Sequence, residues 1–476
     1  MIALLLAALM ASADAPPRVA VTGGTVEGSA APWSNALLFR GIPYAGAPTG
    51  DLRWRAPAPV VPWTGVRGDN ANAPACPQND QKWNHDSAVN ASEDCLTLDV
   101  RTPSLTGRLP VMVWIHGGSN FSGSARGTVL SQITDKGVVL VAIQYRLGLL
   151  GFLADRAAAA EAGGHAGNYG LMDQIAALRW VQANIARFGG DPANVTIFGE
   201  SAGSQDVSLM LAAPGARGLF AKAIMESGTP GFGMPPRPLA DAFALGDQAE
   251  GMLGGSLAEM RKRPVSELLA ADLKLTDASL LTNDFRWLRA TIDGSVLPEA
   301  PRALLAKAPP RPVIVGSNRA EFGAGPVTDA ALTRIFGKRA AEALPFYAAS
   351  DPRLGPPDLQ FGTDWIFRCP AGRMAELLAA HGAPVWRYEF DVSEDGALTS
   401  HSAEIGWVMS PKRFGKSVSL QTYWTNFAKT GDPNGGGQPN WPRYVTSSQA
   451  YAAFDIGGVT PGAKLREPIC SMLEEL

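Results

Sequence analysis

A short apolar run leads directly into a glycine-flanked serine in the stretch Val195-Thr-Ile-Phe-Gly-Glu-Ser-Ala-Gly203. The run from Val195 to Phe198 predicts a buried strand, and the apolar residues after Gly203 predict a helix. Glycine at both flanking positions removes Cβ clashes, so the chain can turn sharply and present Ser201 above the sheet edge. The Gly-x-Ser-x-Gly pattern also occurs by chance in glycine-rich chains, and it is the strand–turn–helix context that makes Ser201 a candidate nucleophile.

Other short apolar runs predict further strands of the same sheet. Helical patterns separate them, and this alternation is typical of an α/β fold with a mainly parallel sheet. The segment Trp386–Phe390 alternates more between polar and apolar residues, so we expect a later, more exposed strand there. The runs expected to be buried strands are Val111–Ile115, Val138–Ile143, Val195–Phe198, Ala221–Met225 and Pro312–Val315.

The clearest helix follows Gly170, where apolar residues recur every three or four positions and form one face. Gly189-Gly-Asp-Pro192 is expected to end it, because glycine accepts the left-handed cap and proline cannot continue a helix. Residues 230–310 are rich in Leu, Ala and charged residues with proline breaks, which predicts helical insertions over the sheet. The apolar positions of the helix are Leu171, Ile175, Leu178, Val181, Ile185 and Phe188.

The composition excludes several classes of protein. Of the 476 residues, 46% are hydrophobic and 18% charged, as in a globular chain with a large core. The 41 Lys and Arg nearly balance the 44 Asp and Glu. A net charge of -3 gives no electrostatic footprint for nucleic acid or an anionic membrane. Five His without an HExxH motif and four Cys without a CxxC pair argue against a zinc site.

The first 15 residues are interpreted as a signal peptide. Ile2–Met10 is an apolar run too short to span a bilayer, and Ala13-Asp-Ala15 offers a small-x-small cleavage site. The segment lacks the usual Lys or Arg, so a buried N-terminal helix or a strand leader is the alternative. No later stretch approaches 18 apolar residues, and residues 16–476 are therefore expected to contain no membrane span.

A glycine-rich turn, His116-Gly-Gly-Ser119, follows the predicted strand Val111–Ile115. A serine needs a base within reach to become nucleophilic, and its attack on a carbonyl creates an oxyanion that needs hydrogen-bond donors. Backbone N–H groups of this turn and of Ala202 are candidates for that role. The alternative is a plain tight turn.

These features belong to an ordered set of motifs that spans nearly the whole mature chain. The set resembles the type-B carboxylesterase/cholinesterase family, which has the α/β-hydrolase fold. The resemblance implies one such domain over residues 16–476, with helical insertions. The motifs are Phe39-Arg-Gly-Ile-Pro-Tyr-Ala45, Leu52-Arg-Trp-Arg-Ala-Pro57, Glu93-Asp-Cys-Leu96, Trp114-Ile-His-Gly-Gly118, Tyr145-Arg-Leu-Gly148, Gly167-Asn-Tyr-Gly-Leu-Met-Asp-Gln174, Tyr423-Trp-Thr-Asn-Phe-Ala-Lys-Thr-Gly-Asp-Pro-Asn434 and Trp441-Pro442.

The resemblance also supplies partners for Ser201. Glu321, which follows the strand Pro312–Val315, matches the family's acid, and His401 matches its histidine. In a triad of this kind His401 deprotonates Ser201, while Glu321 orients the imidazole and stabilises its cation. Other histidines and acids fit the pattern less well, namely His85, His165, His381, Asp351, Asp364 and Asp391.

The oxyanion hole implied by the resemblance consists of the N–H groups of Gly118, Ser119 and Ala202. The family usually has Gly or Ala where Ser119 stands, but the backbone N–H survives the change. The segment Gly406–Ser410 lacks the family's usual Phe-Gly, and the stretch between Glu321 and His401 is shorter than usual. These departures bear on specificity and on the shape of the entrance.

Two residues near these motifs have competing interpretations. A buried Glu200 carboxylate favours the imidazolium that forms during acyl transfer, or it is a structural group bound to backbone donors. Trp83 resembles the choline-site tryptophan of cholinesterases, which binds quaternary ammonium through a cation–π contact. Its spacing to Cys95 is longer than in those enzymes, so packing of the loop is the preferred interpretation.

The four cysteines allow three pairings if the chain is exported. The resemblance favours the disulfides Cys76–Cys95 and Cys369–Cys470. It also implies three ion pairs, Asp364–Arg466, Arg40–Glu93 and Arg146–Asp173.

The sequence therefore predicts a secreted or periplasmic serine hydrolase that cleaves a small-molecule carboxylic ester, neutral and partly hydrophobic, with no metal or organic cofactor. One alternative is a non-catalytic, cholinesterase-like binding or adhesion protein. Another is a hydrolase dedicated to one elaborate natural ester.

Overall fold

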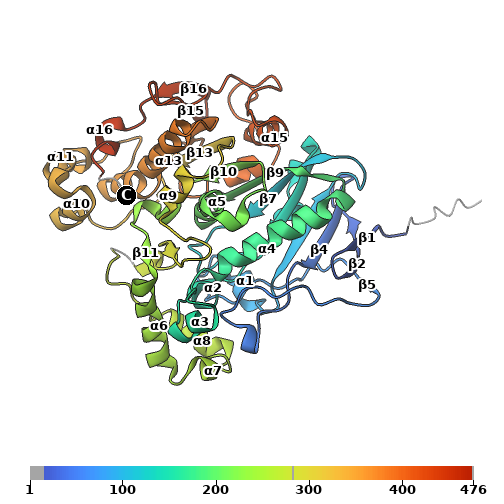
Figure 1. The fold of residues 1–476 in the computed structure, drawn as a ribbon. Helices are drawn as coiled ribbons and strands as arrows, with labels where there is room; N and C mark the ends of the chain where they lie inside the picture. The colour runs from blue at the N-terminus through green and yellow to red at the C-terminus, as the bar shows by residue number, and fades with distance from the viewer. Residues whose placement is uncertain (1–14, 281–282, 474–476) are drawn as a thin grey trace, which may run out of the picture.

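The structure is a computed structural model that describes residues 15–280 and 283–473 (Figure 1). The predicted signal peptide lies outside the described residues except for Ala15. The largest feature of the described part is an eleven-stranded sheet in the order β16-β15-β14-β13-β10-β9-β7-β8-β6-β4-β3. All pairs from β8 to β15 are parallel, and both ends of the sheet are antiparallel. The strands are β3 (Ser29–Ala30), β4 (Leu37–Pro43), β6 (Thr97–Thr102), β7 (Leu109–Ile115), β8 (Val139–Ile143), β9 (Gly190–Glu200), β10 (Lys222–Glu226), β13 (Val313–Asn318), β14 (Val385–Asp391), β15 (Ala450–Asp455) and β16 (Gly458–Ala463).

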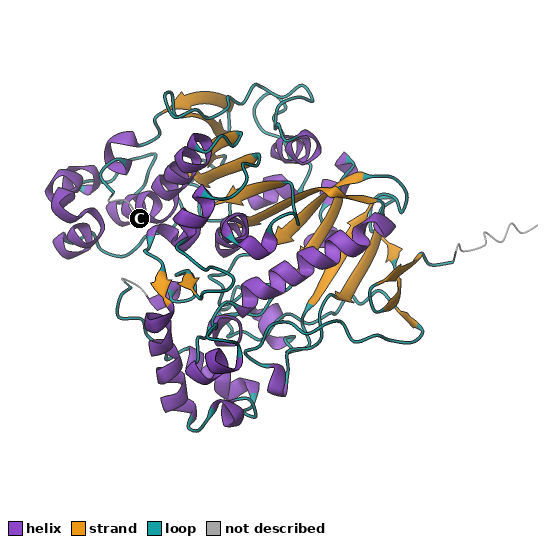
Figure 2. Ribbon diagram, viewed as in Figure 1, coloured by secondary structure: helices purple, strands orange, loops and turns teal. Residues whose placement is uncertain are grey.

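Both faces of this sheet are buried under helices, as Figure 2 shows. Successive residues of a strand point to opposite faces. Val113 of β7 accordingly joins the core layer beneath α4 (Tyr169–Asn184), and Trp114 joins the layer beneath α15 (Leu420–Thr430). The continuous apolar runs of the central strands follow from this double burial, and the predicted α/β architecture is confirmed.

The five runs expected to be buried strands all lie in the parallel part of the sheet, with ends shifted by a few residues. The expectation that Trp386–Phe390 is more exposed is wrong. It forms β14, which lies between β13 and β15 and is buried from Val385 to Phe390. The polar residues of this strand do not indicate exposure to solvent, because the buried Arg368 side chain forms an ion pair with Glu389 of the strand.

The predicted helix after Gly170 is α4, which continues as a 3-10 turn to Phe188. Gly189 ends it with φ 76°, the left-handed conformation expected of a glycine cap. Pro192 lies within β9. Most of α4 is buried, so the protein covers more of the helix than the single apolar face that was predicted.

Of the helices described within residues 230–310, three lie outside the main sheet at the bottom of Figure 1, and α9 lies beside α5 (Ala202–Ala212) and α13 (Cys369–Ala380). The two strands described in this region, β11 (Arg237–Pro238) and β12 (Thr291–Ile292), are short and pair over two residues. Within the described ranges no helix combines the length and apolar character needed to cross a membrane. The helices of this region are α6 (Leu239–Leu253), α7 (Leu257–Met260), α8 (Val265–Asp272) and α9 (Pro301–Ala306).

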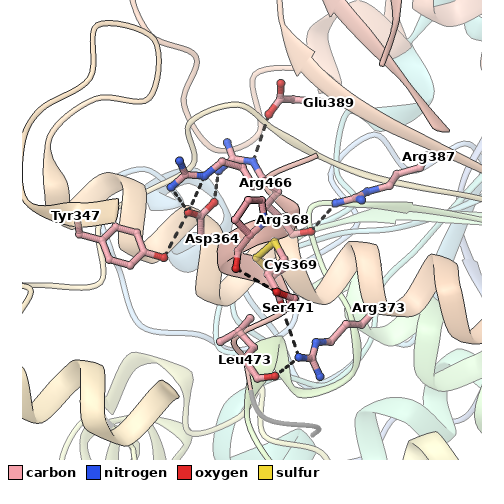
Figure 3. The surroundings of a disulfide bond; sticks show 12 residues. Tyr347, Asp364, Arg368, Cys369, Arg373, Arg387, Glu389, Arg466, Ser471 and Leu473 are labelled. Atoms are coloured by element: carbon pink, nitrogen blue, oxygen red, sulfur yellow. Dashed lines mark hydrogen bonds and ion pairs between the residues drawn. A yellow bond between two sulfur atoms is a disulfide. The ribbon is translucent and has the colours of Figure 1, made fainter. Parts of the chain in front are cut away.

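Both expected disulfides are present. Cys76–Cys95 closes a loop of 19 positions, and Cys369–Cys470 joins the start of α13 (Cys369–Ala380) to α16 (Glu467–Cys470) over 101 positions. Around the second disulfide, Asp364 accepts hydrogen bonds from Arg368 and Arg466, as Figure 3 shows. This cluster fixes the C-terminal segment to the body of the protein.

Of the three expected ion pairs, two form. Asp364 contacts Arg466 at 2.6 Å, and the buried Arg146 contacts Asp173 at 2.7 Å. The pairing of Arg40 with Glu93 is wrong. Arg40 instead pairs with Asp69, which also accepts a hydrogen bond from Ser29. Glu93 instead accepts two hydrogen bonds from the Arg53 guanidinium, both at 2.6 Å.

The longer disulfide is expected to contribute more to stability than the shorter one. In the chain-entropy model, loss of Cys369–Cys470 lowers the free energy of unfolding by about 4–5 kcal/mol and loss of Cys76–Cys95 by about 3 kcal/mol. Denaturant unfolding of the Cys369→Ser/Cys470→Ser and Cys76→Ser/Cys95→Ser double variants measures the two losses. An equal or smaller loss for the first pair contradicts this ranking.

Candidate active site

Ser201 occupies a sharp turn between β9, which ends at Glu200, and α5 (Ala202–Ala212). Its backbone has φ 56° and ψ -126°, a conformation that non-glycine residues rarely adopt. A Cβ on Gly199 or Gly203 would lie only 2.6 Å or 2.0 Å from the carbonyl oxygen of Ile115. Both glycines are therefore required for the turn to pack against the end of β7.

The strained conformation of Ser201 is held by its neighbours. Its N–H donates to the carbonyl of Glu226 at 2.9 Å, at the end of the adjacent strand β10. Its carbonyl accepts from the N–H of Gln205 at 2.9 Å. Ser201 is 9% exposed, so the side chain lies at the surface of a largely buried site.

Glu321 and His401 are brought together although 80 positions separate them. His401 Nδ1 lies 2.7 Å from Glu321 Oε2, and the His401 N–H donates to the Glu321 carbonyl at 3.1 Å. The other carboxylate oxygen, Oε1, accepts from the N–H of Asn318 at 2.8 Å. The rings of Phe322 and Phe367 lie about 5 Å from the imidazole, with centroid distances of 5.0 and 4.9 Å. The imidazole is thereby fixed in position and orientation.

The second imidazole nitrogen faces Glu200. His401 Nε2 lies 3.1 Å from Glu200 Oε1, which also accepts from the hydroxyl of Ser402 at 2.7 Å. Between the described residues no hydrogen bond joins Ser201 to His401. Such bonds are often long in a free enzyme and shorten in the substrate complex. Glu200 binds side chains, which favours its interpretation as a partner of the imidazole over that of a backbone-bound structural group.

The charges around His401 determine its protonation. Burial alone would lower its pKa, but the carboxylates of Glu200 and Glu321 outweigh burial and raise the pKa to about 9. Burial also raises the pKa of Glu200, against the opposing effects of His401 and Ser402. The site therefore holds a strongly basic imidazole between two carboxylates.

The turn after β7 lies beside the nucleophile. A Cβ on Gly117 would lie 3.0 Å from the Ser201 Cβ. Gly118 and Ser119 have φ values of 107° and 59°. A Cβ on Gly118 would lie 2.2 Å from the Ser122 carbonyl oxygen, so glycine is required there. Among the described residues, the backbone N–H groups of Gly118, Ser119 and Ala202 donate no hydrogen bond. Gly118 and Ser119 lie in a turn beside the first turn of α5.

Two further buried carboxylates, Glu404 and Glu226, were not assigned roles from the sequence. Glu404 accepts from Asn318 Nδ2 at 2.7 Å, and burial together with Glu200 and Glu321 raises its pKa to about 8. Burial and then Glu404 raise the pKa of Glu226, which accepts from Trp424. The sequence holds one signal for Glu226, which directly follows the expected strand Ala221–Met225, at the strand end where functional groups gather. The parallel register of β9 and β10 places it opposite Glu200.

The remaining candidates lie away from this site or hold other contacts. His85 pairs with Asp80 at the surface, and the His165 and His381 imidazoles contact the carbonyls of Asp293 and Leu377. Trp83 is 65% exposed, so the expected packing of its loop around this side chain is wrong. In the described part of the chain, no three His, Cys, Asp or Glu side chains are arranged as a metal site.

An α/β sheet with a strained serine in a sharp turn between a central parallel strand and a helix is the arrangement of the α/β-hydrolase class. Comparison with known proteins gives the family. A sequence model of the Carboxylesterase family matches residues 15–338 and 354–472, and the chain belongs to this family.

The relatives agree with this assignment. Carboxylesterase 1E of Rattus norvegicus is 35% identical over 510 residues, covering 92% of this chain and 89% of that protein. Fumonisin B1 esterase of Sphingopyxis macrogoltabida is 34% identical over 477 residues, covering 91% and 86%. The solved structure of a PNB esterase superposes with a TM-score of 0.84 at 30% identity, covering 97% of this chain and all of that one. The protein is a carboxylic-ester hydrolase of the serine type.

Proposed function

We propose that the protein hydrolyses esters through an acyl-enzyme on Ser201, with His401 as base and Glu321 as its orienting carboxylate. The observation that supports this most is the 2.7 Å contact of His401 Nδ1 with Glu321, which leaves Nε2 facing the carboxylate of Glu200, the residue before Ser201. The N–H groups of Gly118, Ser119 and Ala202 form the oxyanion hole.

The proposed reaction has two halves. Ser201 Oγ attacks the ester carbonyl carbon while His401 Nε2 takes its proton, and the carbonyl electron pair becomes the oxyanion. The intermediate collapses, the carbon–alkoxy bond breaks, and His401 returns the proton to the leaving alcohol. Water then attacks the acyl-enzyme with His401 again as base, which releases the carboxylic acid and restores Ser201. The Glu200 carboxylate stabilises the imidazolium in both halves.

We also propose that residues 16–476 form one catalytic domain and that the chain is exported to an oxidising compartment. The two disulfides support export, since such bonds persist outside the cytosol. Hydrolysis in this proposal needs a small-molecule ester and water alone.

A panel of p-nitrophenyl esters with acyl chains from acetate to laurate tests the proposal. We expect turnover of several members, faster for an intermediate chain length because the site is largely buried. Strong turnover of one chemically elaborate ester with only weak turnover of the panel would favour the dedicated hydrolase. Absence of turnover for all of them would favour the non-catalytic binding protein.

Replacing Glu200 with glutamine is expected to shift the pH dependence of catalysis. The base must be neutral to accept the Ser201 proton, so kcat/KM of the wild type rises with pH towards the His401 pKa of about 9. Loss of the Glu200 charge lowers that pKa, so the acid limb moves to lower pH by about 1 unit or more. Glu299→Gln, at an exposed ion pair with Lys307, is the control. An unmoved or upward-shifted limb in Glu200→Gln contradicts the assigned role.

A further inference from the structure

The turn that bears two of the proposed oxyanion donors is followed by a third residue in the left-handed region. Gly118, Ser119 and Asn120 have φ values of 107°, 59° and 53°. Such a run is unfavourable for side-chain-bearing residues and persists only where the surroundings fix it. Asparagine tolerates this region better than most residues, because its short polar side chain bonds locally or to nearby groups.

The Asn120 side chain is 1% exposed and its contacts lie outside its own turn. Its Nδ2 donates to Asp206 Oδ1 at 3.0 Å, and its Oδ1 accepts from the Tyr145 hydroxyl at 3.2 Å. Its backbone carbonyl accepts from the N–H of Gly148 at 2.7 Å. The Tyr145 hydroxyl has a single proton, and Asn120 Oδ1 shares it with the closer carbonyl of His116, which lies 2.7 Å away at the start of the same turn. The turn is thus held at both ends.

Asp206 is the other centre of this network. It is fully buried on α5, accepts a second hydrogen bond from Gln174 of α4 at 2.5 Å, and pairs with no Lys or Arg among the described residues. Burial raises its pKa to about 7, against the hydrogen bonds from Asn120 and Gln174. A buried carboxylate with no cation is unfavourable unless hydrogen bonds satisfy it, so its contacts with Asn120 and Gln174 are strongly held.

Asp206 links the two segments that carry the proposed oxyanion donors, the turn of Gly118 and Ser119 and the start of α5. Ala202, whose N–H is the third proposed donor, opens α5, and Asp206 follows it four residues later on the same side of the helix. The bond from Asn120 to Asp206 therefore fixes the turn of Gly118 and Ser119 relative to the N–H of Ala202. Displacement of a reacting group by about 1 Å can reduce the rate about 100-fold.

We propose that Asn120 and Asp206 are positioning residues that hold the oxyanion hole together without touching the substrate. This inference rests on the proposed function, since it assumes that the three N–H groups bind the oxyanion. It predicts a defect in binding the tetrahedral transition state, with little change in binding the planar ester.

Asn120→Gly tests the side chain separately from the backbone. Glycine adopts φ 53° without strain, so the turn remains accessible while the contacts to Asp206 and Tyr145 are lost. We expect kcat for a p-nitrophenyl ester to fall about 10- to 100-fold with KM within about threefold. The affinity for an aryl trifluoromethyl ketone, which forms a tetrahedral oxyanion adduct on a serine, is expected to fall by the same factor.

Asp206→Ala is expected to reproduce this pattern. Asp206→Asn keeps an acceptor for Asn120 and should restore kcat to within about threefold of the wild type. Asn184→Ala is the matched control, because Asn184 is a fully buried asparagine that bonds Thr22 and Trp180 away from the site. Asn184→Ala should lower the free energy of unfolding but leave kcat and the ketone affinity within about twofold of the wild type. If Asn120→Gly does not fold, the Asp206→Ala and Asp206→Asn variants test the Asn120–Asp206 contact from its other side, and only Asp206→Ala should show the selective loss of ketone affinity.

The outcomes separate the two proposals. Wild-type kcat and ketone affinity in Asn120→Gly and Asp206→Ala, in an active enzyme, would overturn the positioning role and leave the proposed function intact. Equal defects in Asp206→Ala and Asp206→Asn would also overturn it. A wild-type protein that neither turns over esters nor binds the ketone would overturn the proposed function itself.

Discussion

Replacing Ser201 with alanine is expected to lower kcat for a simple ester by about 10⁵- to 10⁶-fold. Alanine leaves the elbow packed but removes the oxygen that forms the acyl-enzyme, so only attack by water in the oxyanion hole remains. The backbone contacts of Ser201 with Glu226 and Gln205 involve main-chain atoms and survive the change. The fold should therefore be retained.

Ser204→Ala is the matched control for this variant. Ser204 lies on α5, the helix that follows Ser201, is fully buried, and donates its hydroxyl to the Gly228 carbonyl at 2.7 Å. Loss of that bond is expected to lower stability by about 1 kcal/mol and to change kcat only a few-fold. Steady-state kinetics on both variants, with unfolding curves, makes the comparison. More than about 1% residual activity in Ser201→Ala would contradict the proposed nucleophile.

Replacing Glu321 with glutamine is expected to lower kcat by about 10³- to 10⁴-fold with the fold intact. Glu321 Oε1 accepts from the N–H of Asn318 at 2.8 Å, so the amide oxygen of glutamine takes that position. Its NH₂ group then faces His401 Nδ1 in place of Oε2. The imidazole is held as the tautomer with hydrogen on Nε2, which cannot accept the Ser201 proton.

The reason for the loss in Glu321→Gln can be checked independently. Unlike Ser201→Ala, this variant keeps its nucleophile, so a slow covalent reaction with an organophosphate should persist. The rate of that reaction and kcat should fall together, while the amount of protein finally modified is unchanged. A kcat within about 10-fold of the wild type would show that Glu321 does not orient the base. Glu93→Gln, at the ion pair with Arg53, provides the control for loss of a partly buried carboxylate.

The parts of the site that are local in sequence were predictable from residues alone. The Ser201 elbow needs only a strand, two glycines and a helix, all within residues 190–212, and the turn at Gly118 follows its strand directly. Glu321 and His401 lie 120 and 200 positions beyond Ser201. Only the family resemblance pointed to them, because a sequence pattern contains no distances between remote segments.

Two of the errors, those on β14 and on Arg40, have a common physical cause. Whether a polar residue is buried depends on a partner that tertiary structure supplies, as Arg368 does for Glu389 in β14 and Asp69 does for Arg40. The same holds for Asp206, which the sequence presents as one more polar position on α5 and whose partners come from two other segments. Periodicity reports which faces are apolar, and it contains no information about such pairings.

The most direct test of the account is covalent labelling. Incubation with a fluorophosphonate, followed by intact mass measurement and peptide mapping, is expected to give one adduct per chain, located on Ser201, with parallel loss of esterase activity. Ser201→Ala should show no adduct, and Ser204→Ala should be labelled as the wild type is. Labelling at another residue, or full esterase activity with Ser201 unmodified, would contradict the assignment of Ser201 as the nucleophile.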